Sequence, residues 1–183
     1  KRVFLYGMTY VPGQTAKPVP ALEKVNEKGI HIALLHGKLE ASENAEQSHD
    51  FVPNRAALAE AGFDYVALGG HRTYSEEQIG NTTLVYPGSL EGRGFDPTET
   101  GDKGPVVVEF DDNGVHVERL IRNKKSIECI NFDLRQERIT DAAALKEALS
   151  SLSGEDRIVR VTLTGTAEFV ASLEEIEEEL APS

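Results

Sequence analysis

Two largely apolar runs constrain the fold of this 183-residue chain more than any other feature. They span residues 30–35 and 63–68, and a glycine and a histidine follow each run within three residues. Continuous runs of this kind are typical of parallel strands that are buried on both faces of a sheet. Because ligands bind beyond the carboxyl ends of such strands, His36 and His71 are candidates for one shared site.

The rest of the chain before residue 123 predicts further strands and short helices. Asn113-Gly114 lies between two alternating segments, at 106–110 and 115–121, which is a strong signal for a β-hairpin. The other expected elements are strands at 3–10 and 83–86, helices at 19–28 and 53–61, and a loop at 38–50.

The pattern changes near residue 123, where we expect a domain boundary. Strand and helix signals then alternate as a β-α-β-α unit, with strands at 126–133 and 157–163 and helices at 141–149 and 168–180. The sequence therefore predicts an α+β protein with two domains, at residues 1–122 and 123–183.

Composition excludes several classes of protein. The chain has 19 basic and 31 acidic residues, and its net charge of −12 argues against non-specific binding of nucleic acid over the whole surface. Cys129 is the single cysteine, so the chain has no internal disulfide and no cysteine-based zinc site. No apolar run approaches the roughly 20 residues that cross a bilayer, and no secretory signal is present. We therefore expect a cytoplasmic protein that does not bind membranes.

Each candidate residue also has an ordinary structural interpretation. His36 and His71 could simply cap their strands and hydrogen-bond the backbone. The loop at 86–95 combines three glycines with Ser89 and Arg93, a composition that suits binding of a phosphate oxygen, although a tight turn is the default interpretation. The chain has no Walker loop, no dinucleotide-binding glycine motif, no zinc-protease helix motif and no nucleophile elbow.

Four segments occur in a characteristic order and spacing: Ile32-Ala33-Leu34-Leu35-His36-Gly37, the run 63–71, the run 85–96 and Lys103-Gly104. Together they resemble the second half of calcineurin-like metallophosphoesterases of the SbcD type. These enzymes are the bacterial exonuclease relatives of the Mre double-strand-break repair nucleases. The resemblance covers about residues 3–122, and the unit that follows resembles more loosely the small capping domain of this family.

The resemblance implies a β-sandwich flanked by helices, of which this chain would hold the second half, followed by the capping domain. It also implies a hydrolase that cleaves phosphodiester bonds of DNA at two metal ions, usually Mn²⁺. His36 and His71 match metal ligands of the family, and His71 is also the candidate catalytic residue. The implied partners are DNA, an SbcC-like ATPase and a second copy of the chain.

The sequence departs from the family pattern in its histidine motif. Reading residues 70–73 as the family's Gly-His-x-His motif puts Thr73 where the second histidine belongs, and sliding the register by one residue puts Gly70 and Arg72 at the ligand positions. The Asp-x-His and Gly-Asn-His-Asp motifs of the family's first half do not occur in these residues. We therefore expect a C-terminal portion of a longer enzyme, which by itself binds Mn²⁺ weakly and does not cleave DNA.

Two other hypotheses stay open. A degenerate relative that has lost catalysis would serve as a binding or scaffold subunit, and both the altered histidine motif and the charge of −12 favour it. A phosphoesterase of the same fold could instead act on a small molecule. Assays with a generic phosphodiester and with DNA would discriminate between these hypotheses.

Overall fold

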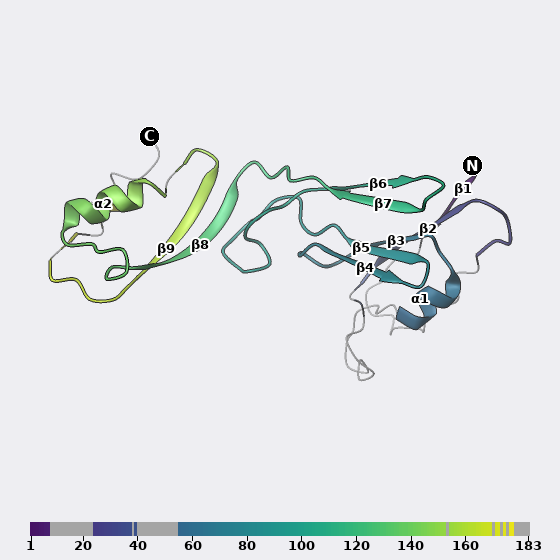
Figure 1. Cartoon of the computed structure of the whole chain (residues 1–183), viewed down its shortest axis with the longest axis horizontal. Coiled ribbons are helices and arrows are strands. Elements are labelled where there is room, and N and C mark those ends of the chain that lie inside the picture. Colours follow the sequence, from purple (N-terminus) through teal and green to yellow (C-terminus); the bar gives the residue numbers. More distant parts are fainter. Residues whose placement is uncertain are drawn as a thin grey trace. The chain divides into compact units, whose positions relative to one another are not determined.

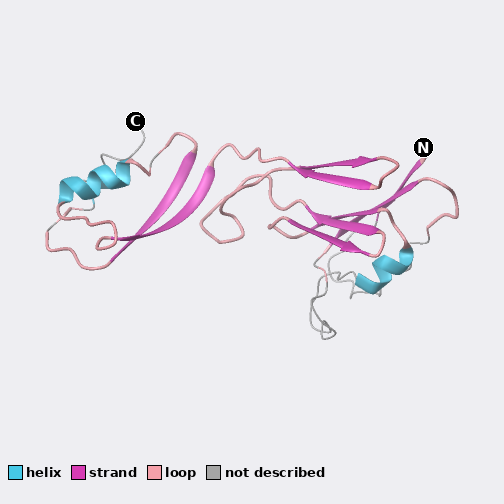
Figure 2. Ribbon diagram, viewed as in Figure 1, coloured by secondary structure: helices cyan, strands magenta, loops and turns pink. Residues whose placement is uncertain are grey.

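The computed structural model describes residues 1–7, 24–37, 39, 55–152, 154–169, 171, 172, 174, 176 and 177. The chain divides into two compact units (Figures 1 and 2). The N-terminal unit consists of residues 1–90 and 103–122, and the C-terminal unit consists of residues 91–102 and 123–183. Strands predominate over helices in the described residues, and both occur, so the predicted α+β class is confirmed at this level.

A five-stranded sheet forms the N-terminal unit, in the order β1-β2-β3-β5-β4 (Figure 1). The strands are β1 (Val3–Gly7), β2 (Ile30–His36), β3 (Tyr65–Gly69), β4 (Ser75–Ile79) and β5 (Thr82–Tyr86). Neighbouring strands are parallel from β1 to β5, and β4 pairs antiparallel with β5 at the edge. The parallel register aligns the carboxyl ends of β2 and β3, where His36 pairs with Gly69.

Helix α1 (Arg55–Ala61) closes one face of this sheet. Leu58 of the helix and Phe63 just after it are each only 1 % exposed, and they pack on apolar side chains of β2, β3 and β5. The helix ends where the sequence predicts, because Gly62 adopts a φ of +65° that favours glycine. This buried layer supports the strands whose ends carry the candidate histidines.

The opposite face of the sheet is covered in part. The hairpin of β6 (Val106–Phe110) and β7 (Val115–Arg119) contributes Phe110, whose ring meets the Tyr65 ring edge-on at 6.1 Å. Over β1 and β2, three side chains of this same face are exposed: Val3 by 54 %, Leu5 by 65 % and Leu34 by 46 %. An apolar face left open in this way is unusual, because parallel sheets are normally covered on both sides.

In the C-terminal unit, β8 (Ser126–Asp133) and β9 (Arg157–Thr164) form a parallel two-stranded sheet, and α2 (Ala142–Ser150) connects them. The Asp141 side chain caps α2 by accepting a hydrogen bond of 2.8 Å from the Ala144 amide. The core of this unit contains Phe132, Leu134, Leu145 and Ile176. On the other face of the sheet, the Arg160 guanidinium lies 4.0 Å from the centre of the Phe95 ring.

Most of the predicted elements are confirmed, two expected helices differ, and one strand was missed. Residues 24–28 are not helical, so the helix predicted at 19–28 does not include them, and residues 19–23 lie outside the described residues. Strand β4 was not predicted, because its sequence is polar and it becomes a strand by pairing with β5. The helix predicted at 168–180 begins later than predicted, since residues 168, 169, 171 and 172 are not helical, whereas 174, 176 and 177 are.

The remaining expectations concern segments that are only partly described. The strand at 3–10 is seen as β1, and residues 8–10 lie outside the described residues, as does the loop at 38–50 apart from Leu39. Within the part of the chain that is described, no helix is long and apolar enough to span a bilayer.

Candidate functional site

His36 lies at the carboxyl end of β2, with its ring against the backbone of the neighbouring strand end. A Cβ atom on Gly69 would lie 3.0 Å from the His36 Nδ1 atom, and one on Gly70 would lie 3.2 Å from Nε2. Gly70 also has a φ of +97°, a conformation that strongly favours glycine. Gly69, which ends β3, and Gly70 after it therefore leave space in which the His36 ring fits.

His71 follows these glycines and is exposed. Its Nδ1 atom lies 3.1 Å from the carbonyl oxygen of Thr73. Because a carbonyl oxygen can only accept, Nδ1 is the protonated nitrogen of this hydrogen bond, and the neutral ring then has its lone pair on Nε2. A backbone carbonyl that fixes the tautomer in this way is common for histidines that act as metal ligands or bases.

Tyr86, the last residue of β5, contacts both histidine segments. Its hydroxyl donates a hydrogen bond of 2.6 Å to the Gly37 carbonyl and accepts one of 2.9 Å from the Leu39 amide. Its ring centre lies 5.4 Å from that of His71, with the two rings tilted by 59°. Burial raises the pKa of the Tyr86 hydroxyl, against smaller opposing effects of the Leu39 amide and Arg55. The structure thus brings His36 and His71 to one edge of the sheet, around Tyr86.

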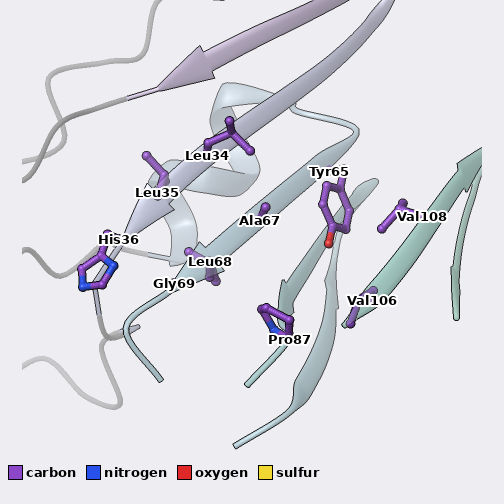
Figure 3. Close-up of a pocket in the computed structure, with 10 residues that line it drawn as sticks. All are labelled: Leu34, Leu35, His36, Tyr65, Ala67, Leu68, Gly69, Pro87, Val106 and Val108. Carbon is purple, nitrogen blue, oxygen red and sulfur yellow. The ribbon is translucent and has the colours of Figure 1, made fainter. Parts of the chain in front are cut away.

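A cavity of about 540 Å³ lies on the partly covered face of the sheet (Figure 3). His36 lies at one end of this cavity, and Val106 and Val108 of the hairpin lie at the other. Apolar side chains predominate in its lining, which consists of Leu34, Leu35, His36, Tyr65, Ala67, Leu68, Gly69, Pro87, Val106 and Val108. The cavity gives the His36 end of the site an apolar neighbourhood.

The glycine-rich loop at 86–95 is divided between the two units. Ser89, in the N-terminal unit, donates its amide hydrogen to the Arg72 carbonyl at 3.0 Å, so it lies beside the residue that follows His71. Gly88 has a φ of +78°, and a Cβ there would come within 2.8 Å of the same carbonyl oxygen. Gly88 therefore has a clear structural role, as the default interpretation of this loop supposes. A phosphate contact by Ser89 stays a prediction.

Arg93 belongs to the C-terminal unit and is exposed. Its amide lies 3.3 Å from a carboxylate oxygen of Glu99. A Cβ on Gly92 would collide with the Glu99 carbonyl oxygen, so the close approach of these two backbone segments requires glycine. Like Ser89, Arg93 stays a predicted phosphate contact.

The donor set at the sheet edge is incomplete for a two-metal centre. Within the described ranges, no group of three or more histidine, cysteine, aspartate or glutamate side chains is placed to hold a metal ion. His36 and His71 offer imidazole nitrogens, whereas two divalent ions with Mn²⁺ chemistry also require carboxylate oxygens. The described residues therefore do not fit a complete metal centre by themselves.

Sequence reasoning missed Tyr86 as a member of this site. The available signal was a tyrosine at the end of a short buried strand, directly before Pro87-Gly88. The two histidines likewise follow the ends of buried strands. A buried tyrosine needs a partner for its hydroxyl, and the loop after a neighbouring strand is the nearest source of one.

Comparison with known proteins gives one informative match. No protein-family model matches the chain. The DNA double-strand break repair protein Mre11 of Halobacterium salinarum is 29 % identical over 174 residues, which cover 92 % of this chain and 43 % of the relative. The resemblance to the Mre11/SbcD-type metallophosphoesterases is thereby confirmed.

The similarity to Mre11 bears on both units of the structure. A match over 92 % of the chain cannot be confined to the N-terminal unit, so it also includes most of the C-terminal unit. The chain spans less than half of the length of this Mre11 relative. The two histidines therefore lie in a region that is similar to part of an Mre11 protein.

Proposed function

We propose that this chain is the C-terminal portion of a metal-dependent DNA repair nuclease of the Mre11/SbcD type. Residues 1–122 are the second half of its nuclease domain, and residues 123–183 are its capping domain. The observation that carries the proposal is the placement of His36 and His71 at the carboxyl ends of two adjacent parallel strands. The match to Mre11 over most of the chain supports it.

The open face of the N-terminal sheet also supports the proposal. Val3, Leu5 and Leu34 expose apolar surface over β1 and β2, while the β6–β7 hairpin covers the β3 side of the same face. A second sheet layer packed on this face would complete a β-sandwich and remove that apolar surface from water. The hairpin is then the part of that second layer which this chain supplies.

In the whole protein, His36 and His71 would supply imidazole nitrogens to a manganese centre, and its carboxylates would come from outside these residues. Two such ions can activate a water molecule and stabilise the attacking and leaving oxygens of a phosphodiester. Ser89 and Arg93 would contact DNA phosphates. The proposed partners are DNA, an SbcC-like ATPase and a second copy of the chain, and the proposed location is the cytoplasm.

A nuclease assay on the whole protein and on the 183-residue chain tests this proposal. With Mn²⁺, the whole protein should degrade linear DNA, and His36→Ala or His71→Ala should reduce the rate by at least about 100-fold. His116→Ala is the matched control, because His116 is an exposed histidine of the β7 strand, where it pairs with Asp111. It should cleave at the wild-type rate.

The 183-residue chain alone should show no cleavage. Cleavage by this chain that disappears in His36→Ala would show that its own residues complete the metal centre. A whole protein that cleaves equally well with and without both histidines would refute the proposed site.

A catalytically inactive scaffold is the second candidate function, and Thr73 favours it. In one of the two registers of the family motif, Thr73 stands in place of the second histidine, and its carbonyl oxygen is the hydrogen-bond acceptor for His71. If the whole protein binds DNA without cleaving it, Thr73→His should be examined for restored Mn²⁺-dependent cleavage. Activity on a generic nitrophenyl phosphodiester but not on DNA would instead indicate a small-molecule phosphoesterase.

A further inference from the structure

We infer that Tyr86 is a positioning residue, which holds His36 and His71 in a fixed relation without itself taking part in the reaction. The inference deepens the proposed function and rests on it for the role of the two histidines. Its geometric part concerns only contacts within the N-terminal unit. It therefore predicts measurable effects whether or not the whole protein cleaves DNA.

The Tyr86 hydroxyl fixes the chain directly after His36. Strand β2 ends at His36, and Leu39 is the next described residue beyond Gly37. The hydroxyl makes two hydrogen bonds to this segment, one to the Gly37 carbonyl and one from the Leu39 amide. The Gly37 amide is bonded in turn to the Gly69 carbonyl at 2.9 Å, so the turn after His36 is held from β5 and from β3.

The Tyr86 ring restricts His71. A separation of 5.4 Å and a tilt of 59° lie in the range of favourable contacts between aromatic rings. The Thr73 carbonyl holds the Nδ1 side of the imidazole, and the phenol ring limits where the remainder can move. One side chain therefore contacts the segment of one histidine and the ring of the other.

The support of Tyr86 is rigid. Every residue of β5 is buried, and the Tyr86 side chain belongs to the core cluster that also contains Leu58 and Phe63. A residue anchored in this way can hold the strand ends that it contacts in a fixed position, as functional sites require.

The hydroxyl is not available for proton transfer, which distinguishes positioning from catalysis. A phenol has one proton to donate, and that of Tyr86 is used by the Gly37 carbonyl at 2.6 Å. Any effect of removing this hydroxyl on the chemistry must therefore act through the histidines.

The test compares Tyr86→Phe with Tyr6→Phe in the 183-residue chain. Tyr6 is the matched control, because its hydroxyl also makes two hydrogen bonds, one with His31 Nδ1 at 2.8 Å and one from the Val25 amide at 3.2 Å, and its ring packs on the same core cluster. Tyr86→Phe should speed hydrogen exchange of the Leu39 amide about tenfold, as expected for loss of one buried hydrogen bond. It should also shift the ring ¹⁵N resonances of His36. Tyr86→Leu, which removes the ring, should shift those of His71 as well.

In the whole protein, Tyr86→Phe should lower kcat for DNA cleavage by 10–100-fold with a smaller change in KM. Tyr6→Phe should leave kcat, KM and the resonances of His36 and His71 unchanged. Histidine resonances and Leu39 exchange that are the same in Tyr86→Phe as in the wild type would overturn the inference. Cleavage by Tyr86→Phe at the wild-type kcat and KM would do so too.

The two proposals fail in different ways. Altered histidine resonances in a whole protein that never cleaves DNA would support the positioning role and refute the nuclease. Should the variants fail to fold, the wild-type chain still decides the question. Nuclear Overhauser contacts between the rings of Tyr86 and His71 and a slowly exchanging Tyr86 hydroxyl proton are expected, and their absence would overturn the inference.

Discussion

The two units both contain parallel strands, yet their strands differ in what covers them. In the N-terminal unit, β5 is buried along its whole length and β3 almost so, because α1 covers one face and the hairpin covers the other. In the C-terminal unit, β9 alternates strictly between half-buried and exposed residues, and α2 covers only one face. The sequence patterns show the same difference, because a strand needs apolar residues on every face that is covered.

Strand β1 is an exception to this agreement between sequence pattern and covering. All five of its residues are apolar, aromatic or glycine, as in a strand covered on both faces, but Val3 and Leu5 are exposed. On β8 and β9 the mismatch is smaller. The face away from α2 carries the polar residues Asn131, Thr162 and Arg160, and Ile158 on this face is 40 % exposed. Among the described residues, more apolar surface is therefore exposed over β1 and β2 than on β8 and β9.

The largest expected effect is a loss of stability in the N-terminal unit that leaves the C-terminal core unaffected. Phe63→Ala should destabilise the N-terminal unit by about 3–5 kcal/mol, because Phe63 is 1 % exposed and its removal leaves a cavity beneath the sheet. All five tyrosines lie between residues 6 and 86, so tyrosine fluorescence during denaturation with urea reports on this unit alone.

Leu145→Ala is the matched control for Phe63→Ala in the C-terminal core, where Leu145 is 2 % exposed. Leu145→Ala should lower the urea concentration at which the helical circular dichroism signal of α2 is lost. The urea midpoint of the tyrosine fluorescence transition should not change. If either substitution shifted both transitions equally, the two units would unfold as one and would not have independent cores.

A smaller effect is expected at alkaline pH, and it is specific to the N-terminal unit. Burial raises the pKa of Tyr65 to about 12, from an ordinary value near 10. Between these values the unfolded chain loses the phenol proton while the folded unit keeps it, so stability is complete below pH 10 and falls as pH rises toward 12. At pH 11, one unit above the unfolded pKa, the loss should be roughly 1.4 kcal/mol. Urea titrations of wild type and Tyr65→Phe at pH 8 and pH 11 measure it.

Tyr65→Phe removes the pH-dependent contribution of Tyr65 to stability and leaves the contributions of the other tyrosines. The fall in stability from pH 8 to pH 11 should therefore be shallower in Tyr65→Phe than in the wild type. Equal falls would show that Tyr65 is not protected in the folded unit.

The smallest expected effect concerns the strand pair of the C-terminal unit. Arg157 binds Glu128 through two hydrogen bonds of 3.0 and 2.7 Å across β8 and β9, with both side chains about one third exposed. Glu128→Gln should therefore cost only about 0.5–1 kcal/mol. The Arg157 hydrogen bond lowers the pKa of Glu128, so its stabilisation is present above the usual carboxyl pKa and is lost as pH falls through the lowered value.

Thermal unfolding at pH 7 and pH 3, followed through α2, measures this contribution. The unfolding temperature of Glu128→Gln should lie below that of the wild type at pH 7, and this difference should be smaller at pH 3. Glu147→Gln, on the exposed surface of α2, is the control and should behave as the wild type at both values. A larger loss of thermal stability in Glu147→Gln than in Glu128→Gln would mean that the charge of α2 contributes more to stability than the Glu128–Arg157 pair.

Local signals in the sequence were enough to predict most elements and their ends. The start of α2 follows from the Asp141 cap, the end of α1 from Gly62, and the β6–β7 hairpin from Asn113-Gly114. Each of these depends on residues that contact each other along the chain. By contrast, β4 has the polar sequence Ser-Glu-Glu-Gln-Ile and becomes a strand because β5 offers it an open edge. No local pattern could predict that pairing.

The candidate site shows the same division. The sequence by itself determined that His36 and His71 follow buried strands, because apolar runs and the glycines beside them mark where such strands end. Only the tertiary structure decided that these strand ends are adjacent, that Gly69 and Gly70 accept the His36 ring, and that Tyr86 contacts both segments. The physical reason is that parallel strands are joined by long connections, so the order of strands in the sheet is set by packing of whole layers and not by neighbouring residues.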